Sequence, residues 1–135
     1  MNTSFFDYLS QTANSSDAVS VALLEEAQKR FEQIELKKNQ FLVKESEICA
    51  FFCYVESGVL QHAITINDEE KTTYLALRNS ATSSLNSFLK MIPSRKSIKA
   101  LVDCKLWVIN QKDFKDLIQN NNAFHQFYYN LIEKQ

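Results

Sequence analysis

The spacing of hydrophobic residues changes along the chain, and each change predicts a different kind of element. In the first 30 residues the clearest pattern is a three- and four-residue repeat, which is typical of a helix. Its members are Val19, Ala22, Leu23 and Ala27. Ser15-Ser16-Asp17 precedes the repeat with side chains that favour a helix N-cap. We therefore expect one or two N-terminal helices within residues 1–30.

Between residues 31 and 110 the spacing falls to two, which predicts β-strands. The expected strands cover residues 31–36, 41–43, 50–55, 59–66, 72–77, 97–102 and 105–109. Residues 50–55 form an uninterrupted apolar run, as in a strand that is buried on both faces. Asn67-Asp68 lies between two strand patterns and predicts a hairpin turn.

A short helix near residues 82–91 interrupts these strands. Its apolar residues are Leu85, Phe88, Leu89 and Ile92, and Pro93 ends it. Residues 78–84, which precede it, are small and polar. Thr82 or Ser83 is the expected helix cap. Alternatively, main-chain N–H groups at the start of this helix hold an anion together with Arg95.

The last segment, residues 111–135, returns to helical spacing and predicts two C-terminal helices. Their apolar stripes contain Phe114, Leu117 and Ile118, then Phe124, Phe127, Tyr128 and Leu131. Such stripes normally pack into a core. The whole order predicts an α+β fold, in which an antiparallel β-roll is flanked by helices from both ends.

Length and composition support one compact domain over residues 1–135. Hydrophobic residues make up 45% of the chain, and the formal net charge is -1. This balance argues against direct nucleic-acid binding, which needs a basic surplus. No apolar run is long enough to span a membrane, and no signal peptide is evident. Cys49, Cys53 and Cys104 show no scaffold spacing, so we expect free thiols and a cytoplasmic protein.

Several motifs occur in the order found in the sensor domains of Crp/Fnr regulators. The matching stretches are residues 36–45 (LKKNQFLVKE), 52–60 (FCYVESGVL), 93–103 (PSRKSIKALVD), 106–109 (LWVI) and 113–114 (DF). The chain therefore resembles a cyclic-nucleotide-binding domain over residues 31–132. The resemblance implies a double-stranded jelly-roll over residues 31–110, with helices in residues 1–30 and 111–135.

In the family that this chain resembles, a phosphate cassette binds the cyclic nucleotide. A Gly-Glu-Leu turn enters a short helix, the Glu accepts a ribose hydroxyl, and an Arg about ten residues later neutralises the phosphate. Aligned on Leu85, the Gly, Glu and Arg positions fall on Ser83, Ser84 and Ser94. Arg95 follows the arginine position by one residue, which turns a strand side chain to the opposite face.

These substitutions predict that cyclic AMP does not bind in the usual way and that the domain has no cofactor. Any ligand contact would then involve Ser83, Ser84, Leu85, Ser94 and Arg95, with a small molecule whose identity the sequence leaves open. An enzyme is not expected, because the chain has one glycine and no phosphate-binding loop or nucleophile elbow. Neither a zinc motif nor an N-terminal cysteine cluster is present, so no metal site is expected.

Two functional hypotheses follow. The first is the ligand-sensing domain of a Crp/Fnr-like transcriptional regulator, which dimerises through its C-terminal helix. It would bind DNA only if a helix-turn-helix follows, and the chain ends at Gln135, about where that dimer helix begins in the family. A piece of a longer regulator and a stand-alone sensor both fit this end. The second hypothesis is a β-roll that serves as a protein-interaction or oligomerisation module without a small-molecule ligand.

Overall fold

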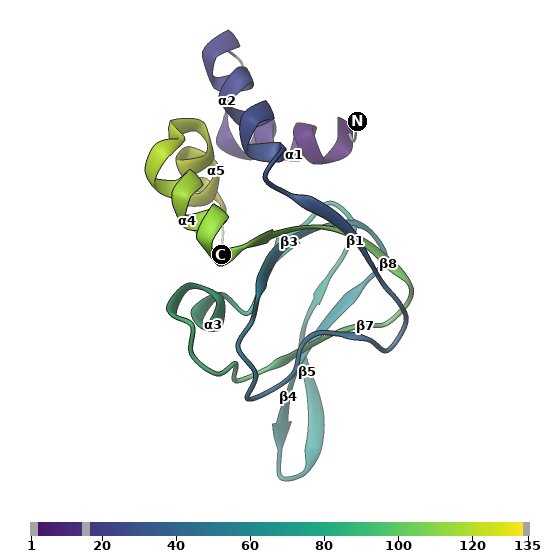
Figure 1. The fold of residues 1–135 in the computed structure, drawn as a ribbon. Helices are drawn as coiled ribbons and strands as arrows, with labels where there is room; N and C mark the ends of the chain where they lie inside the picture. Colours follow the sequence, from purple (N-terminus) through teal and green to yellow (C-terminus); the bar gives the residue numbers. More distant parts are fainter. Residues whose placement is uncertain (1–2, 15–16, 134–135) are drawn as a thin grey trace. The chain divides into compact units, whose positions relative to one another are not determined.

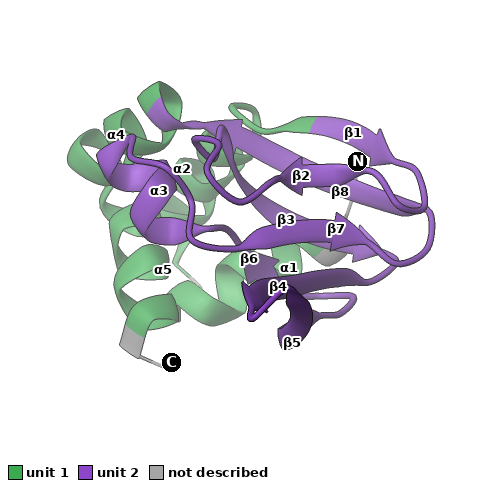
Figure 2. Ribbon diagram, turned by 90° about the horizontal axis from the view of Figure 1, so that it is seen from below, with its two compact units in different colours: residues 1–32, 112–135 green, residues 33–111 purple. Residues whose placement is uncertain are grey.

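A computed structural model of the chain describes residues 3–14 and 17–133. The chain forms two compact units, which Figure 2 colours separately: Met1–Glu32 with Lys112–Gln135, and Gln33–Gln111. The predicted order of helices, strands, one short helix and two final helices is confirmed (Figure 1). A single domain over residues 1–135 stays a prediction.

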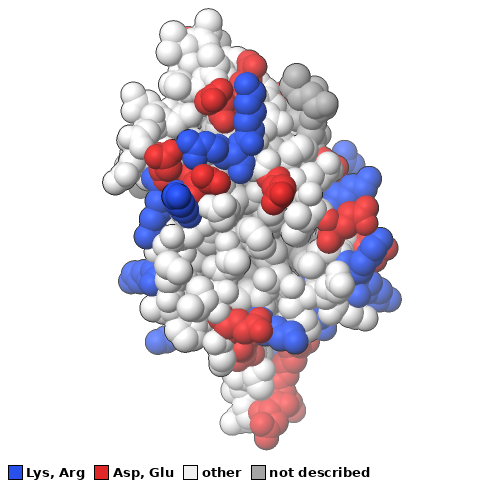
Figure 3. Space-filling model, in the orientation of Figure 1, with Lys and Arg blue, Asp and Glu red and all other residues white. Residues whose placement is uncertain are grey.

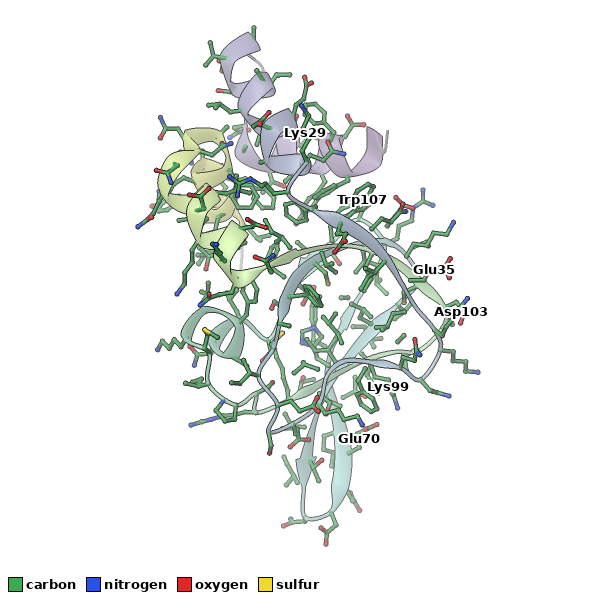
Figure 4. All side chains as sticks on the ribbon, in the orientation of Figure 1. Lys29, Glu35, Glu70, Lys99, Asp103 and Trp107 are labelled. Carbon is green, nitrogen blue, oxygen red and sulfur yellow. The ribbon has the colours of Figure 1, made fainter. Side chains whose placement is uncertain are left out.

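The second unit is the β-roll, built from two four-stranded sheets with strand orders β1-β8-β3-β6 and β2-β7-β4-β5. The strands of the first sheet are β1 (Glu32–Leu36), β8 (Cys104–Asn110), β3 (Phe51–Ser57) and β6 (Ala81–Thr82). Those of the second are β2 (Phe41–Val43), β7 (Ser97–Ala100), β4 (Leu60–Ile66) and β5 (Glu69–Ala76). Side chains from both sheets point into the space between them (Figure 4).

Strand β3 is the centre of the first sheet. It pairs antiparallel with β8 on one side and with β6 on the other. Four consecutive residues, Phe52 to Val55, are buried, which confirms the expectation of a strand covered on both faces. Strand β6 was not predicted, because its two residues sit in a small polar stretch that carries no strand pattern.

Strands β4 and β5 form a hairpin, with Ile66 opposite Glu69 and a two-residue loop between them. The loop residues Asn67 and Asp68 have φ of 52° and 64°, as in a type I′ turn, so the turn prediction is confirmed. Strand β5 begins at Glu69, three residues before its predicted start. The acidic residues at this tip stand out in Figure 3.

Gly58 lies at the sharp turn between β3 and β4, where φ is +102°. A Cβ added here would lie 2.5 Å from the Sγ of Cys104 and 2.9 Å from the carbonyl oxygen of Asp103. Most of the other left-handed positions hold Asn or Asp, including Asn39 and Asn79. The chain therefore keeps glycine for the turn that excludes a side chain.

The first unit contains α1 (Thr3–Ala13), α2 (Ala18–Gln28) and α5 (Asn122–Glu133), together with nearly all of α4 (Gln111–Asn120). Asp17 caps α2 by accepting a 3.0 Å hydrogen bond from the main-chain N–H of Ser20, as predicted; Ser15 and Ser16 lie outside the described residues. The rings of Phe31, Phe114 and Phe127 surround that of Phe124, so the apolar stripe of α5 belongs to a core.

Arg30 and helix α4 are joined by ion pairs within this first unit. The guanidinium donates to Asp113 Oδ1 at 3.0 Å and to Asp116 Oδ2 at 2.7 Å. The hydrogen bond from Arg30 lowers the pKa of Asp116 below its usual range. This fork fixes the chain just after α2 against the first turns of α4.

The three cysteines are buried free thiols, as expected. Burial raises the pKa of Cys53 far above the ordinary thiol range, and it also raises that of Cys104. A thiol that keeps its proton is a poor nucleophile and a poor metal ligand. Cys53 and Cys104 therefore act as small apolar groups of the roll.

Candidate functional site

The predicted cassette positions meet in the interior of the β-roll unit. The Oγ atoms of Ser84 and Ser94 lie 2.7 Å apart, although ten residues separate them. Both side chains are buried, with exposed fractions of 5% and 4%. The alignment therefore picked out two residues whose side chains are in contact, and whether they bind a ligand stays a prediction. Their hydroxyls bind each other, where the family pattern would place a carboxylate and a guanidinium.

Ser94 is held from its side chain and from its main chain. Its hydroxyl donates to the carbonyl oxygen of Lys96 at 2.7 Å, so the hydrogen between the two serines comes from Ser84. The main chain of Ser94 accepts from Ser46 and donates to Glu47, each at 2.8 Å. The Oγ of Ser94 also accepts the N–H of Lys96 at 3.2 Å. This serine is fully hydrogen-bonded without any ligand.

Helix α3 (Leu85–Lys90) follows the first serine and packs on strand β3 through Phe88, which is fully buried. The helix has six residues, and its N-cap, Ser84, makes no side-chain capping bond. The prediction that Thr82 or Ser83 caps it is therefore wrong. Ser83 instead donates to the carbonyl oxygen of Phe51 at 2.7 Å, because a buried hydroxyl takes the nearest acceptor.

The other two predicted site residues lie beside this pair. Leu85 is half-buried at the first position of α3, whereas Arg95 is exposed. Within the described part of the chain, no ion pair or hydrogen bond involves the guanidinium of Arg95. Whether Leu85 or Arg95 contacts a ligand stays a prediction.

Sequence reasoning did not assign three further polar residues to this site: the buried Thr82 on β6 and His62 on β4, and the half-buried Lys96 just before β7. The Oγ1 of Thr82 lies 2.8 Å from Nε2 of His62, and His62 is only 2% exposed. Nδ1 of His62 is buried without a hydrogen-bond partner among the described residues. Lys96 is half-buried, unlike its neighbour Arg95.

His62 and Lys96 are electrostatically coupled. Burial, which is the larger cause, and the positive charge of Lys96 together lower the pKa of His62 to about 4. Burial also lowers the pKa of Lys96. Burial thus disfavours the charged form of both basic groups. His62 is therefore a buried histidine with one ring nitrogen hydrogen-bonded and the other without a partner among the described residues.

The low pKa of His62 predicts a loss of stability in mild acid. The unfolded chain binds a proton near pH 6.5 and the folded chain only near pH 4, so stability is full above 6.5 and falls as the pH drops toward 4. We expect His62 to account for about 2 kcal/mol between pH 7.5 and pH 5. Urea denaturation at both pH values measures it.

Two variants isolate this effect. His62→Gln should lose the His62 contribution to the fall in stability, whatever its absolute stability at pH 7.5. His125→Gln removes an exposed histidine in the other unit and should keep the wild-type fall. An equal fall in wild type and His62→Gln would show that His62 is not the responsible group.

The cyclic nucleotide-binding domain model matches residues 33–121, about two thirds of the chain. The chain belongs to this family. The match covers the β-roll, the cassette helix α3 and the helix α4 that follows. No curated protein matches the sequence.

Several solved structures share the fold of this cyclic nucleotide-binding domain. The Thermus thermophilus catabolite activator protein is 17% identical, with a TM-score of 0.73 over 84% of this chain and 53% of that one. The sensor domain of the transcriptional regulator DNR from Pseudomonas aeruginosa is 16% identical, with a TM-score of 0.71 over 94% of this chain and 81% of that one. The regulatory domain of Toxoplasma gondii PKA with cAMP is 19% identical, with a TM-score of 0.73 over 92% of this chain and 46% of that one.

At these identities the likeness establishes the fold, and the resemblance to Crp/Fnr sensor domains is confirmed at that level. The chain spans about half the length of the Thermus protein. The family and these neighbours are regulatory domains rather than enzymes. None of the described helices is long and apolar enough to cross a membrane. The described residues include no group of three or more potential metal ligands.

Proposed function

We propose that this cyclic nucleotide-binding domain is the ligand-sensing part of a Crp/Fnr-like transcriptional regulator and does not bind cyclic AMP in the usual way. The contact between Ser84 and Ser94 carries the proposal. The family pattern has a glutamate and an arginine at the positions that align with these serines. In this chain both side chains are neutral hydroxyls that already bind each other. A cyclic phosphate entering there would find no arginine at either position.

The size of the expected loss follows from the bonds that are missing. A hydrogen bond to a charged group contributes about 1.5–3 kcal/mol. Without both the ribose contact and the phosphate contact, affinity falls by roughly 10²- to 10⁴-fold, at about 1.4 kcal/mol per factor of ten. A cyclic nucleotide would also have to break the bond between the serines.

Isothermal titration calorimetry with cyclic AMP and cyclic GMP tests the proposal. We expect no saturable heat up to about 1 mM nucleotide, since weak binding of this order follows from the missing bonds. Circular dichroism of the same sample confirms that the protein is folded. Micromolar affinity for either nucleotide would contradict the proposal.

The proposed partners follow from this role. A small molecule binds in the roll, and the terminal helices transmit its binding. Homodimerisation would use α5, whose Tyr129 and Ile132 are 54% and 46% exposed. DNA would be contacted only through a helix-turn-helix beyond this domain, and the cytoplasm is the proposed compartment. Sedimentation equilibrium of wild type and Ile132→Glu tests the dimer.

One observation favours a protein-interaction module as the second candidate. Strand β5 lies at the edge of its sheet, and Tyr74 and Leu75 on it are 50% and 45% exposed. An edge strand with exposed apolar side chains can pair with another chain. Under this hypothesis Leu75→Lys would abolish self-association in gel filtration, and no metabolite would raise the melting temperature.

A further inference from the structure

The outward face of the second sheet of the β-roll contains a row of apolar and polar side chains. Strand pairing sets one residue of each strand beside the next in this outer row: Phe41, Lys99, Gln61 and Leu75. Ile98, the neighbour of Lys99 on β7, is fully buried, so the outer row faces away from the interior. Phe41 and Leu75 are 37% and 45% exposed. The solvent side of an antiparallel sheet is normally polar, so this row has apolar surface free for a partner.

Two ammonium groups give the outer row a positive charge. The Nζ atoms of Lys44 and Lys99 lie 5.3 Å and 5.9 Å from the centroid of the Phe41 ring. Among the described residues, no carboxylate forms an ion pair with either ammonium group. The row therefore combines an exposed aromatic ring with two cations whose charge is not balanced by a direct contact. A partner that fits it brings both apolar and acidic side chains.

The hairpin of β4 and β5 extends beyond the same sheet as an arm of this matching character. Strand β7 pairs with β4 only as far as Ala63, so residues 64–71 have no strand partner outside the hairpin (Figure 1). This arm contains three acidic residues and one lysine, which gives it a net charge of -2. Its Ile66 is 48% exposed. The arm is therefore acidic and partly apolar, and it complements the outer row.

The arm is too far from the outer row of its own molecule to neutralise it. Both belong to one sheet, and Thr65, which pairs with Glu70, lies four residues beyond Gln61 along β4. At about 3.3 Å per residue, this separation is about 13 Å along the strand. Exposed charges more than about 10 Å apart are largely screened by salt. The opposite charges can therefore meet only when the arm of one molecule contacts the row of another.

We propose that the outer row binds the β4–β5 arm of a second copy of this chain, with Lys99 opposite Glu70. A two-fold dimer makes this contact twice, because the arm of each molecule meets the row of the other. A two-stranded hairpin by itself is only marginally stable, so the contact also stabilises the arm. The interface involves only the β-roll unit. It is separate from the dimer contact proposed for α5, and it goes beyond the proposed sensor function.

Exchange of the two charges tests the assignment. Lys99→Glu sets two carboxylates against each other in the proposed contact, and Glu70→Lys sets two ammonium groups against each other (Figure 4). Lys105→Glu is the matched control, because Lys105 is an exposed lysine on β8 in the other sheet of the roll. All proteins also carry Ile132→Glu, which removes the contact proposed for α5, and the protein with this change alone is the parent. Sedimentation velocity up to about 200 µM detects dimers with dissociation constants up to about 100 µM.

We expect the parent to dimerise in about 50 mM sodium chloride and to dissociate in about 500 mM, because salt screens exposed charges. Lys99→Glu and Glu70→Lys should each raise the dissociation constant at least about tenfold, because like charges across an interface repel. An equimolar mixture of the two should dimerise like the parent, since every exchanged charge then meets its opposite. Lys105→Glu should also behave like the parent.

The proposal fails if the parent remains a monomer over the whole concentration range. It also fails if the mixture does not restore the dimer, or if Lys105→Glu weakens it as much as Lys99→Glu, which would indicate general repulsion between the molecules. A dimer that tolerates both exchanges but is lost in Leu75→Lys would assign the contact to the edge of β5 instead. All these outcomes leave the proposed sensor function standing, because the titrations with cyclic nucleotides decide it separately.

Discussion

Gly58→Ala should lower the free energy of unfolding of the β-roll by about 3 kcal/mol or more. A residue with a side chain is strained at the φ of +102° found here, at a cost of about 1–3 kcal/mol. The new methyl would in addition lie 2.5 Å from Sγ of Cys104, closer than atoms approach in proteins. Urea denaturation followed by the fluorescence of Trp107 measures the change.

A double variant tells side-chain crowding from main-chain crowding. Cys104→Ala removes the sulfur, yet the carbonyl oxygen of Asp103 and the Cα of residue 104 remain 2.9 Å from the added Cβ. Gly58→Ala combined with Cys104→Ala should therefore stay less stable than Cys104→Ala alone by about 2 kcal/mol, because backbone strain remains. Full rescue in the double variant would place the whole conflict at the sulfur.

Phe88→Ala is expected to cost about 3–5 kcal/mol, the usual range for removing a fully buried phenylalanine. Its ring lies 6.4 Å from that of Phe52 on β3 and fastens the short helix α3 to the first sheet. A helix of six residues is not stable by itself, so this packing keeps it formed. Chemical denaturation of the purified variant gives the value.

Asn86→Ala is the matched control for the same helix. Asn86 is exposed on α3, so its replacement should change stability by less than about 0.5 kcal/mol. Because α3 begins directly after Ser84, loss of its packing would also weaken the contact between Ser84 and Ser94. A Phe88→Ala protein as stable as Asn86→Ala would show that the helix is held by something other than this ring.

The sequence predicted most of the roll because its strands repeat every two residues and its turns use distinctive residues. Asn67 and Asp68 adopt the left-handed conformation that a two-residue hairpin requires, as their residue types suggested. Strand β6 escaped prediction because two residues are too short for any periodicity. The early start of β5 escaped because Glu69 and Glu70 are exposed acidic residues with no apolar alternation.

Within the candidate site, the sequence predicted only the residues that align with the phosphate cassette of the family. Ser84 and Ser94 were selected together by the resemblance to the family, and the structure shows that their side chains are in contact. Their mutual hydrogen bond could not be predicted, because a hydroxyl chooses its partner from the tertiary structure. His62 carries no motif, and only the pairing of β4 with β7, which sets it opposite Ile98, shows where it lies in the roll.

The neutral serine pair has a consequence for how such a domain changes over time. A roll that places an acid and a base in its interior is penalised whenever one of them is lost alone, because the remaining ion is left buried without a counter-charge. When one of two neutral hydroxyls is replaced, no buried ion is left behind. Ser84 and Ser94 can therefore be substituted one at a time, and the ligand preference of the site can change while the β-roll stays folded.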